Sequence, residues 1–302
     1  MYCLELSILL HRALEGRVET LMSSLSDAHW QGDPEGVHEV RVASRRVRAV
    51  LDLVQPGLYP GFKRQTRKLK ALTRALGRTR EMDVHIAILE EMGSRVPGLA
   101  TCSGMEHALE AVEARRRKAR KAMARELDGL SLKSLPEMLQ VPSLPDPFRA
   151  GDLIGTIWTC LEPWLEGAFP DAQLLDQEEV PALHALRIRV KRLRYALEVL
   201  AGGFPTPPER QLKHLRALQT ALGSHHDLAT LEALLTGLHQ GLVARDRAVL
   251  AAGTHEVLDH LGEERLIAFE QFRALAVGLP KGKFISDLRL DLGLVPVSIE
   301  TS

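Results

Sequence analysis

The sequence predicts an all-α fold on three grounds. Apolar residues recur at spacings of three and four along most of the chain, beginning with Leu6, Leu10 and Leu14. Leu, Ala, Arg and Glu, which favour helices, are abundant, and the alternating pattern of β-strands is scarce. The helical pattern also occurs twice, because the segment that starts at His38 returns 146 positions later at His184. We therefore expect a helical protein built by internal duplication.

Glycine and proline indicate where the helices begin and end. The first helical pattern covers residues 6–25, and the next begins with Asp33 as the N-cap and Pro34 in the first turn. Further breaks fall at residues 32–34, 55–61, 97–98, 101–104, 202–208 and 278–282. The proline-rich stretch 141–147 is the expected hinge between the two copies. The last twenty residues, 283–302, do not fit the helical pattern, so we expect a tail, a short strand or disorder there.

Two segments carry the duplication. Residues 38–48 read His-Glu-Val-Arg-Val-Ala-Ser-Arg-Arg-Val-Arg and correspond to residues 184–194, which read His-Ala-Leu-Arg-Ile-Arg-Val-Lys-Arg-Leu-Arg. Residues 69–77 correspond in the same way to residues 215–223. Two matches that share one offset without a gap predict a first repeat over about residues 1–140 and a second over about 150–279.

Positive charge is concentrated locally although the chain is neutral overall. The 39 basic and 39 acidic residues cancel, yet the segment 38–80 contains twelve Lys or Arg residues against only Glu39 and Asp52. Such segregation creates a positive field on one part of a neutral molecule. The sequence therefore predicts a basic surface.

The basic residues form stripes along helices. At about 100° per residue, the side chains of the segment 38–48 that share an arc of about 80° are His38, Arg41, Arg45 and Arg48. Their counterparts in the second copy are His184, Arg187, Lys191 and Arg194. The next helix of the first copy has a similar stripe made of Lys63, Arg67, Lys70, Arg74 and Arg78, whereas the second copy keeps only Lys213 and Arg216. Like charges at successive turns repel one another, so these stripes favour a bound polyanion.

Three further groups of residues need an interpretation of their own. His38 and His184 each begin a basic stripe, where a histidine can act as a proton-dependent donor to phosphate. Arg46 and Arg192 fall on the packing face, so we expect structural ion pairs of Arg46 with Glu81 and of Arg192 with Asp227. The basic run formed by Arg115, Arg116, Arg117, Lys118, Arg120, Lys121 and Arg125 spreads round its helix, and a solvated surface is the simpler explanation.

Cysteines and hydropathy indicate the compartment. Cys3, Cys102 and Cys160 are odd in number and far apart, which favours a reducing cytoplasm over a disulfide framework. The N-terminal segment lacks a signal-peptide pattern, and no apolar run approaches the length of a membrane helix. We expect a cytoplasmic protein without membrane contact.

The doubled ladder, followed in each copy by Leu-Gly and an acidic residue at Glu81 or Asp227, resembles the CHAD domain, the conserved histidine α-helical domain. The resemblance covers about residues 1–279 and leaves 280–302 as a C-terminal tail. It implies two pseudo-symmetric four-helix bundles with a basic surface or pore between them that binds inorganic polyphosphate. It also implies that both ladders and the basic stripes on the following helices supply the ligand residues, and it adds polyphosphate granules as a candidate association.

The chain departs from that family in two respects. Many relatives have Arg-Asp where this chain has Arg80 and Glu81, and others are fused to an acidic, strand-rich catalytic domain that has no counterpart here. We therefore expect binding without catalysis, with no cofactor and no metal.

Two alternative functions remain open from the sequence alone. Single-stranded nucleic-acid binding usually combines a basic groove with aromatic platforms, but aromatic residues are only 4% of the chain and, apart from Tyr195, lie outside the ladders. A metal-dependent phosphohydrolase could use His225, His226 and Asp227 together with His38 or His184. The first copy has Thr79, Arg80 and Glu81 in place of the His-His-Asp sequence, so this motif is not repeated.

Overall fold

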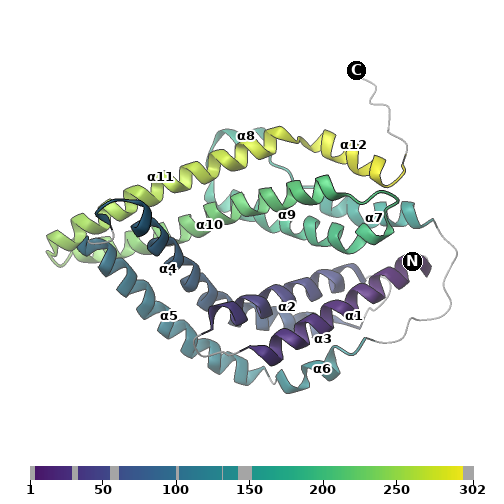
Figure 1. The fold of residues 1–302 in the computed structure, drawn as a ribbon, viewed down its shortest axis with the longest axis horizontal. Coiled ribbons are helices and arrows are strands. Elements are labelled where there is room, and N and C mark those ends of the chain that lie inside the picture. The colour runs from purple at the N-terminus through teal and green to yellow at the C-terminus, as the bar shows by residue number, and fades with distance from the viewer. Residues whose placement is uncertain are drawn as a thin grey trace.

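The computed structural model describes residues 4–28, 33–54, 61–99, 102–130, 132–141 and 152–294. Within these ranges the chain is helical and contains no strand, so the predicted all-α class is confirmed (Figure 1). The helices of the first half are α1 Leu4–Asp27, α2 Pro34–Val54, α3 Lys63–Ala75, α4 Gly77–Arg95, α5 Ser103–Gly129, η2 Leu132–Ser134 and α6 Leu135–Met138. Those of the second half are α7 Leu153–Leu165, α8 Ala172–Asp176, α9 Val180–Leu200, η3 Ala201–Gly203, α10 Glu209–Val243, α11 Ala248–Gly278 and α12 Lys281–Asp291.

Several predicted helix ends are confirmed. The Asp33 carboxylate caps α2 by accepting hydrogen bonds from the backbone N–H groups of Glu35 and Gly36, each at 3.0 Å. Helix α4 ends at Arg95, just before Pro97 and Gly98. The expected hinge 141–147 and the break 55–61 lie mostly outside the described residues.

Equivalent helices begin at equivalent positions of the two repeats. Helices α2 and α9 both start and end 146 residues apart, and the same offset joins the first residues of α3 and α10 and of α6 and α12. The repeats differ at Leu76, where the first divides into α3 and α4 while α10 continues through Gly223 as one helix of 35 residues.

The hydrophobic core does not follow the division into repeats. A large cluster combines buried side chains of α1, α2 and α3 with those of α7, α9, α12, the beginning of α10 and the end of α11. A smaller cluster joins α4 and α5 to α10 and α11 through residues such as Leu89, Val112, Leu235 and Val257. In Figure 1, α4 and α5 extend away from α1–α3 to reach the far ends of α10 and α11. Both clusters thus tie the repeats together, and the division into two separate four-helix bundles stays a prediction.

Helices α5 and α11 approach each other closely at two glycines. A Cβ atom added to Gly104 would overlap the backbone of Gly253 and Thr254, and one added to Gly253 would meet the backbone of Gly104. Because only glycine leaves room for such an approach, these positions fix how the ends of the two repeats pack.

The segment after residue 280 differs from the sequence prediction. Residues 281–291 form α12, whose Phe284 and Leu288 are fully buried, and the Phe284 ring packs edge-on against Phe169 with 5.2 Å between centroids. The expectation of non-helical structure is wrong here, because a single apolar stripe on a short helix is enough to anchor it to the core. Residues 295–302 lie outside the described residues. None of the described helices has an apolar stretch that could cross a bilayer.

Candidate polyanion-binding cleft

A cleft of about 900 Å³ lies where the two ladder helices, α2 and α9, pack near α3, α4 and α10. Most of its charged lining is basic, and both repeats contribute to it. The basic lining residues, apart from histidine, are Arg41, Arg45, Arg48, Arg67, Lys70, Arg74, Arg78 and Arg80 from the first repeat and Arg187 from the second. His38 and His226 also line it, and no Phe, Tyr or Trp is among its lining residues. The structure therefore brings together most of the residues predicted for the first repeat.

The arginines of the cleft have hydrogen-bond donors without partners. The Nε atoms of Arg41, Arg45, Arg48 and Arg187 are buried and make no hydrogen bond among the described residues. The pKa of Arg41 is lowered to about 10, first by burial and then by the neighbouring Arg45 and Arg187, against the opposing effect of Asp227. Burial of these donors and positive charges close together costs free energy, and an anion bound in the cleft would offset this cost.

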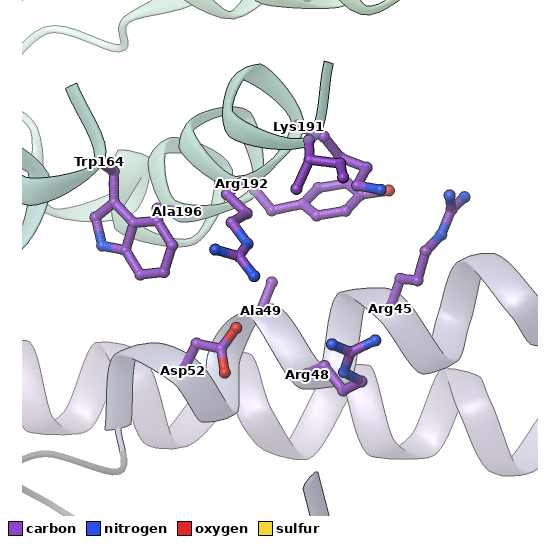
Figure 2. A pocket seen from close by; sticks show the side chains of 10 residues that line it. Arg45, Arg48, Ala49, Asp52, Trp164, Lys191, Arg192 and Ala196 are labelled. Atoms are coloured by element: carbon purple, nitrogen blue, oxygen red, sulfur yellow. The ribbon is translucent and has the colours of Figure 1, made fainter. Parts of the chain in front are cut away.

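Lys191 belongs to a smaller neighbouring cavity of about 170 Å³, shown in Figure 2. Arg45 and Arg48 line both spaces, so the cavity and the cleft adjoin. Burial lowers the pKa of Lys191 to about 7, with Arg45 and Arg187 as the strongest charged contributors. Lys191 is therefore close to its titration point near neutral pH, and a nearby anion would favour its charged form.

The ladder histidines are held in environments that disfavour their charged form. Burial lowers the pKa of His38, with Arg80 as the next cause. His184 does not line the cleft, but its Nδ1 lies 3.1 Å from Nδ1 of His226, whose pKa burial lowers to about 4. One of these two rings must donate and the other accept, so the two cannot both be charged while this hydrogen bond persists.

Several predicted ligand residues lie away from the cleft. Lys63 and Lys213 are exposed and line neither the cleft nor the smaller cavity. Arg194 is buried, forms an ion pair with Glu198 at 2.6 Å, and donates to Gln219 at 2.9 Å. Arg216 also faces Glu198, at 3.5 Å. The second ladder thus contributes Arg187 to the cleft and Lys191 to the cavity, while Arg194 and Arg216 are engaged with Glu198.

The structure places two carboxylates in the cleft, and the predicted ion pairs of Arg46 and Arg192 are wrong. No ion pair joins Arg46 to Glu81 or Arg192 to Asp227 among the described residues, and both acids line the cleft instead. Burial raises the pKa of both acids, and arginines that include Arg41 act against this rise. Asp227 is influenced instead by Arg187 and Arg41, and Glu81 by Arg41 and Arg78, because α10 and α4 place these carboxylates in the cleft.

Sequence reasoning also missed Arg80, Gln219 and His226 as lining residues. The available signal for Arg80 was its place one turn after Gly77, next to Glu81 in the part of the motif that departs from the family. His226 corresponds to Arg80 by the offset of 146 residues, so the duplication itself was an available signal for it. Gln219 corresponds to Thr73 and had no such signal.

The basic run on α5 is only partly a solvated surface. Arg116 and Arg120 each place a guanidinium nitrogen 3.7 Å from Oδ1 of the buried Asp83, whereas Arg117 pairs with Glu113 on the same helix at 3.5 Å. Two members of the run therefore hold α5 against α4 instead of facing solvent alone.

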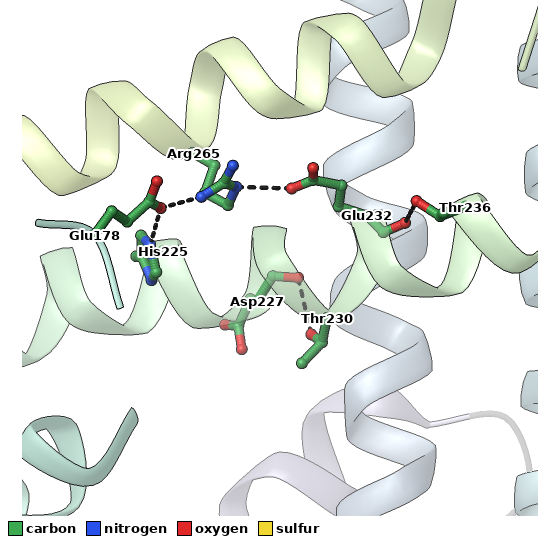
Figure 3. Close-up of polar contacts among 7 residues, drawn as sticks. All are labelled: Glu178, His225, Asp227, Thr230, Glu232, Thr236 and Arg265. Carbon is green, nitrogen blue, oxygen red and sulfur yellow. Dashed lines mark hydrogen bonds and ion pairs between the residues drawn. The ribbon is translucent and has the colours of Figure 1, made fainter. Parts of the chain in front are cut away.

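A separate polar network fixes the far side of α10. Figure 3 shows the Glu178 carboxylate between the His225 ring and the Arg265 guanidinium, and Arg265 also donates to Glu232 at 2.7 Å. His225 and Asp227 project from opposite sides of α10, as their two-residue spacing on a helix requires (Figure 3). The His225, His226 and Asp227 side chains therefore have different partners and do not converge, and the described residues contain no group of three metal-ligating side chains.

Residues 12–236 match the CHAD domain family, and the chain belongs to this family. Two solved structures are similar in fold. The crystal structure of the CHAD domain from the plant Ricinus communis is 24% identical with a TM-score of 0.65, and the match covers 91% of this chain and 93% of that one. PptA from Streptomyces chartreusis is 17% identical with a TM-score of 0.67, covering 89% of this chain and 98% of that one. No curated protein sequence matches the chain.

Proposed function

We propose that this protein binds inorganic polyphosphate in the basic cleft and does not catalyse a reaction on it. The observation that carries the proposal is the set of buried, unpartnered Nε donors on Arg41, Arg45, Arg48 and Arg187, which come from both repeats. Family membership adds support, since the residues that resemble the family's ligand set include these four.

The chemistry of the lining favours polyphosphate over nucleic acid. Polyphosphate is a thread of charged groups without bases, so its recognition requires stacked guanidinium and ammonium donors, of which guanidinium can bind phosphate in a bidentate manner. Proteins that bind single-stranded nucleic acid add aromatic side chains on which the bases stack. Among the residues that line the cleft there is no Phe, Tyr or Trp.

The phosphohydrolase alternative gains no geometric support. His225 is engaged with Glu178, His226 with His184, and Asp227 faces Arg41 and Arg187. A catalytic metal would need several of these side chains to converge on one point. Incubation with long-chain polyphosphate and Mg²⁺, Mn²⁺ or Zn²⁺ tests this directly, and release of orthophosphate above a protein-free control would overturn the non-catalytic part of the proposal.

We extend the proposal to the cellular setting, which is the cytoplasm and polyphosphate granules within it. The sequence contains only three cysteines, which are far apart and odd in number, as suits a reducing compartment. Colocalisation of a fluorescent fusion with stained granules checks this, and a fusion that stays diffuse in granule-containing cells would contradict the granule association.

A gel-shift titration with long-chain polyphosphate, competed with RNA and with orthophosphate, tests the main proposal. We expect binding in the low-micromolar range or tighter, displacement by unlabelled polyphosphate, and weak competition by RNA. Release of counterions makes log affinity fall steeply with log salt in proportion to the number of contacts. Equal competition by RNA would favour the nucleic-acid alternative, and an affinity unchanged between low and moderate salt would rule out the basic cleft as the site.

A further inference from the structure

The small cavity next to the cleft differs from it in chemistry. Its lining combines cations with two large aromatic side chains, Trp164 of α7 and Tyr195 of α9. Trp164 also lines a neighbouring cavity of about 260 Å³, together with Arg192. The aromatic groups that the cleft lacks are therefore present in the cavity that adjoins it, and helical periodicity does not predict Trp164 at this place.

The cavity also contains a carboxylate without an ion-pair partner. In Figure 2, Asp52 of α2 and Arg192 of α9 point toward each other, with the Trp164 indole beside Arg192. Arg48 and Arg192 are close enough to act on the pKa of Asp52, which burial raises, but no cation lies within 4 Å of its carboxylate among the described residues. The Asp52 carboxylate and the Arg192 guanidinium thus face each other without forming an ion pair.

The equivalent position of the second repeat shows the opposite arrangement. Glu198, which is 146 residues after Asp52, forms ion pairs with Arg194 at 2.6 Å and with Arg216 at 3.5 Å. The Arg194 guanidinium also covers the Tyr195 ring, 4.4 Å from its centroid. Of these two carboxylates, Asp52 has no ion pair among the described residues, whereas Glu198 has two. Trp164, which lines the cavity beside Asp52, corresponds by the offset of 146 residues to Val18 of the first repeat.

We propose that this cavity binds the base of a guanine nucleotide, with the phosphates held by Arg45, Arg48 and Lys191 where the cavity meets the cleft. A volume of about 170 Å³ suits one ring, since a cavity of about 150 Å³ holds benzene. The second ring of a purine extends toward the adjoining cavity beside Trp164. The inference shares arginines with the polyphosphate cleft but does not depend on polyphosphate binding.

Hydrogen-bonding chemistry selects guanine among the bases. A carboxylate such as Asp52 accepts hydrogen bonds from N1–H and the 2-amino group of guanine, while a guanidinium such as Arg192 donates to O6. Adenine has an acceptor at N1, which a carboxylate repels, and it lacks a carbonyl oxygen. The planar Trp164 indole and the Arg192 guanidinium are both groups on which a base stacks.

Isothermal titration of the full chain with GTP, ATP, ITP and tripolyphosphate at one ionic strength, without metal, tests the inference. Tripolyphosphate lacks a base, so charge alone predicts that it binds at least as tightly as GTP. Stacking and base contacts predict that GTP binds about tenfold more tightly than tripolyphosphate and about tenfold more tightly than ATP, with ITP between them. Equal affinity for GTP and tripolyphosphate would overturn the inference, and equal affinity for GTP and ATP would overturn the assignment of guanine and of Asp52.

Variants locate the effect in the cavity. Trp164→Ala should reduce GTP affinity to that of tripolyphosphate, and Asp52→Asn, which keeps the size of the side chain, should abolish the preference for GTP over ATP. Glu198→Gln is the matched control at the equivalent position and should keep that preference. A retained preference in Asp52→Asn would contradict the inference even if Trp164→Ala fails to fold. A GTP preference in a protein that does not bind polyphosphate would support the cavity and refute the proposed function.

Discussion

Arg41 and Arg187 occupy equivalent positions of the two repeats and line the same cleft. Their proximity is visible in the pKa of Arg41, which falls to about 10 because of burial first and then because of Arg45 and Arg187. Two residues that are 146 positions apart in the sequence thus lie close enough in the structure to influence each other's charge. A long polyanion in this cleft would contact both repeats at once.

We predict that the first repeat contributes more of the polyphosphate affinity than the second. The double variant Arg41→Gln, Arg45→Gln should weaken binding about a hundredfold, and Arg187→Gln, Lys191→Gln about tenfold, because the first pair lies among more basic neighbours in the cleft. Fluorescence titration with long-chain polyphosphate measures both.

The matched control for these variants is Lys63→Gln, Lys213→Gln, which removes the same charge from two exposed residues outside the cleft. Its affinity should stay within about twofold of the wild type, since exposed charges are strongly screened. Equal losses in the three double variants would mean that overall charge, and not the cleft, determines binding.

The ladder was predictable from the sequence because helical spacing alone places residues three and four apart on one face. Helical spacing groups Arg41, Arg45 and Arg48, which all line the cleft, and the duplication pairs α2 with α9, which have matching bounds. Helical spacing failed for Arg194, which shares the spacing of Arg48 but is captured by Glu198 four residues later. Periodicity shows which face a residue occupies but not which neighbour competes for its side chain.

Contacts between the repeats could not be predicted from the pattern. The shared offset of 146 residues predicts Asp227 as the partner of Arg192, yet Asp227 lies near Arg41 and Arg187 in the cleft. Trp164 reaches the adjoining cavity from α7, a helix without basic residues that the charge pattern did not single out. Such contacts depend on how α2, α7, α9 and α10 pack together, and the periodicity of a single sequence does not predict this packing.

We predict that Arg46→Met leaves stability unchanged or raises it slightly. Arg46 is half-buried, its Nε makes no hydrogen bond, and no carboxylate lies within 4 Å of it among the described residues. Replacing an unpaired guanidinium by an apolar side chain of similar length removes a desolvation cost, so the free energy of unfolding should change by no more than about 1 kcal/mol. Chemical denaturation measures this free energy. A decrease of about 3 kcal/mol would contradict the prediction and support the ion pair with Glu81 that the sequence predicts.

We predict that Glu178→Gln destabilises the fold but leaves polyphosphate binding intact. Glu178 accepts from both Arg265 and His225 and lies outside the cleft. Loss of these charge-assisted hydrogen bonds should cost about 1–3 kcal/mol of unfolding free energy. Thermal melting beside a binding curve tests this, and lost binding with an unchanged melting temperature would assign Glu178 to the site instead.

The same network makes stability depend on pH. Burial acts to raise the pKa of Glu178, but hydrogen bonds from Arg265 and His225 outweigh it and hold the pKa below its ordinary value of 4.5. A carboxyl whose pKa is lower in the folded state contributes stability above its unfolded pKa, and this contribution disappears as pH falls through the folded value. The wild type should therefore lose stability below about pH 4.5 more steeply than Glu178→Gln, whose side chain does not titrate.

We predict that polyphosphate affinity falls as pH rises above about 7, and that Lys191 causes part of this fall. In the free protein the pKa of Lys191 is about 7, so the side chain must gain a proton to pair with phosphate at higher pH. Binding raises that pKa, and affinity therefore declines by up to about tenfold per pH unit until the pKa of the bound state is reached. The histidines contribute only at lower pH, because their pKa values are also lowered. Lys191→Arg keeps its charge over this range and should bind with a flatter profile between pH 7 and about 9. Dissociation constants measured across that range decide the matter, and identical profiles for the wild type and Lys191→Arg would exclude Lys191 as the titrating group.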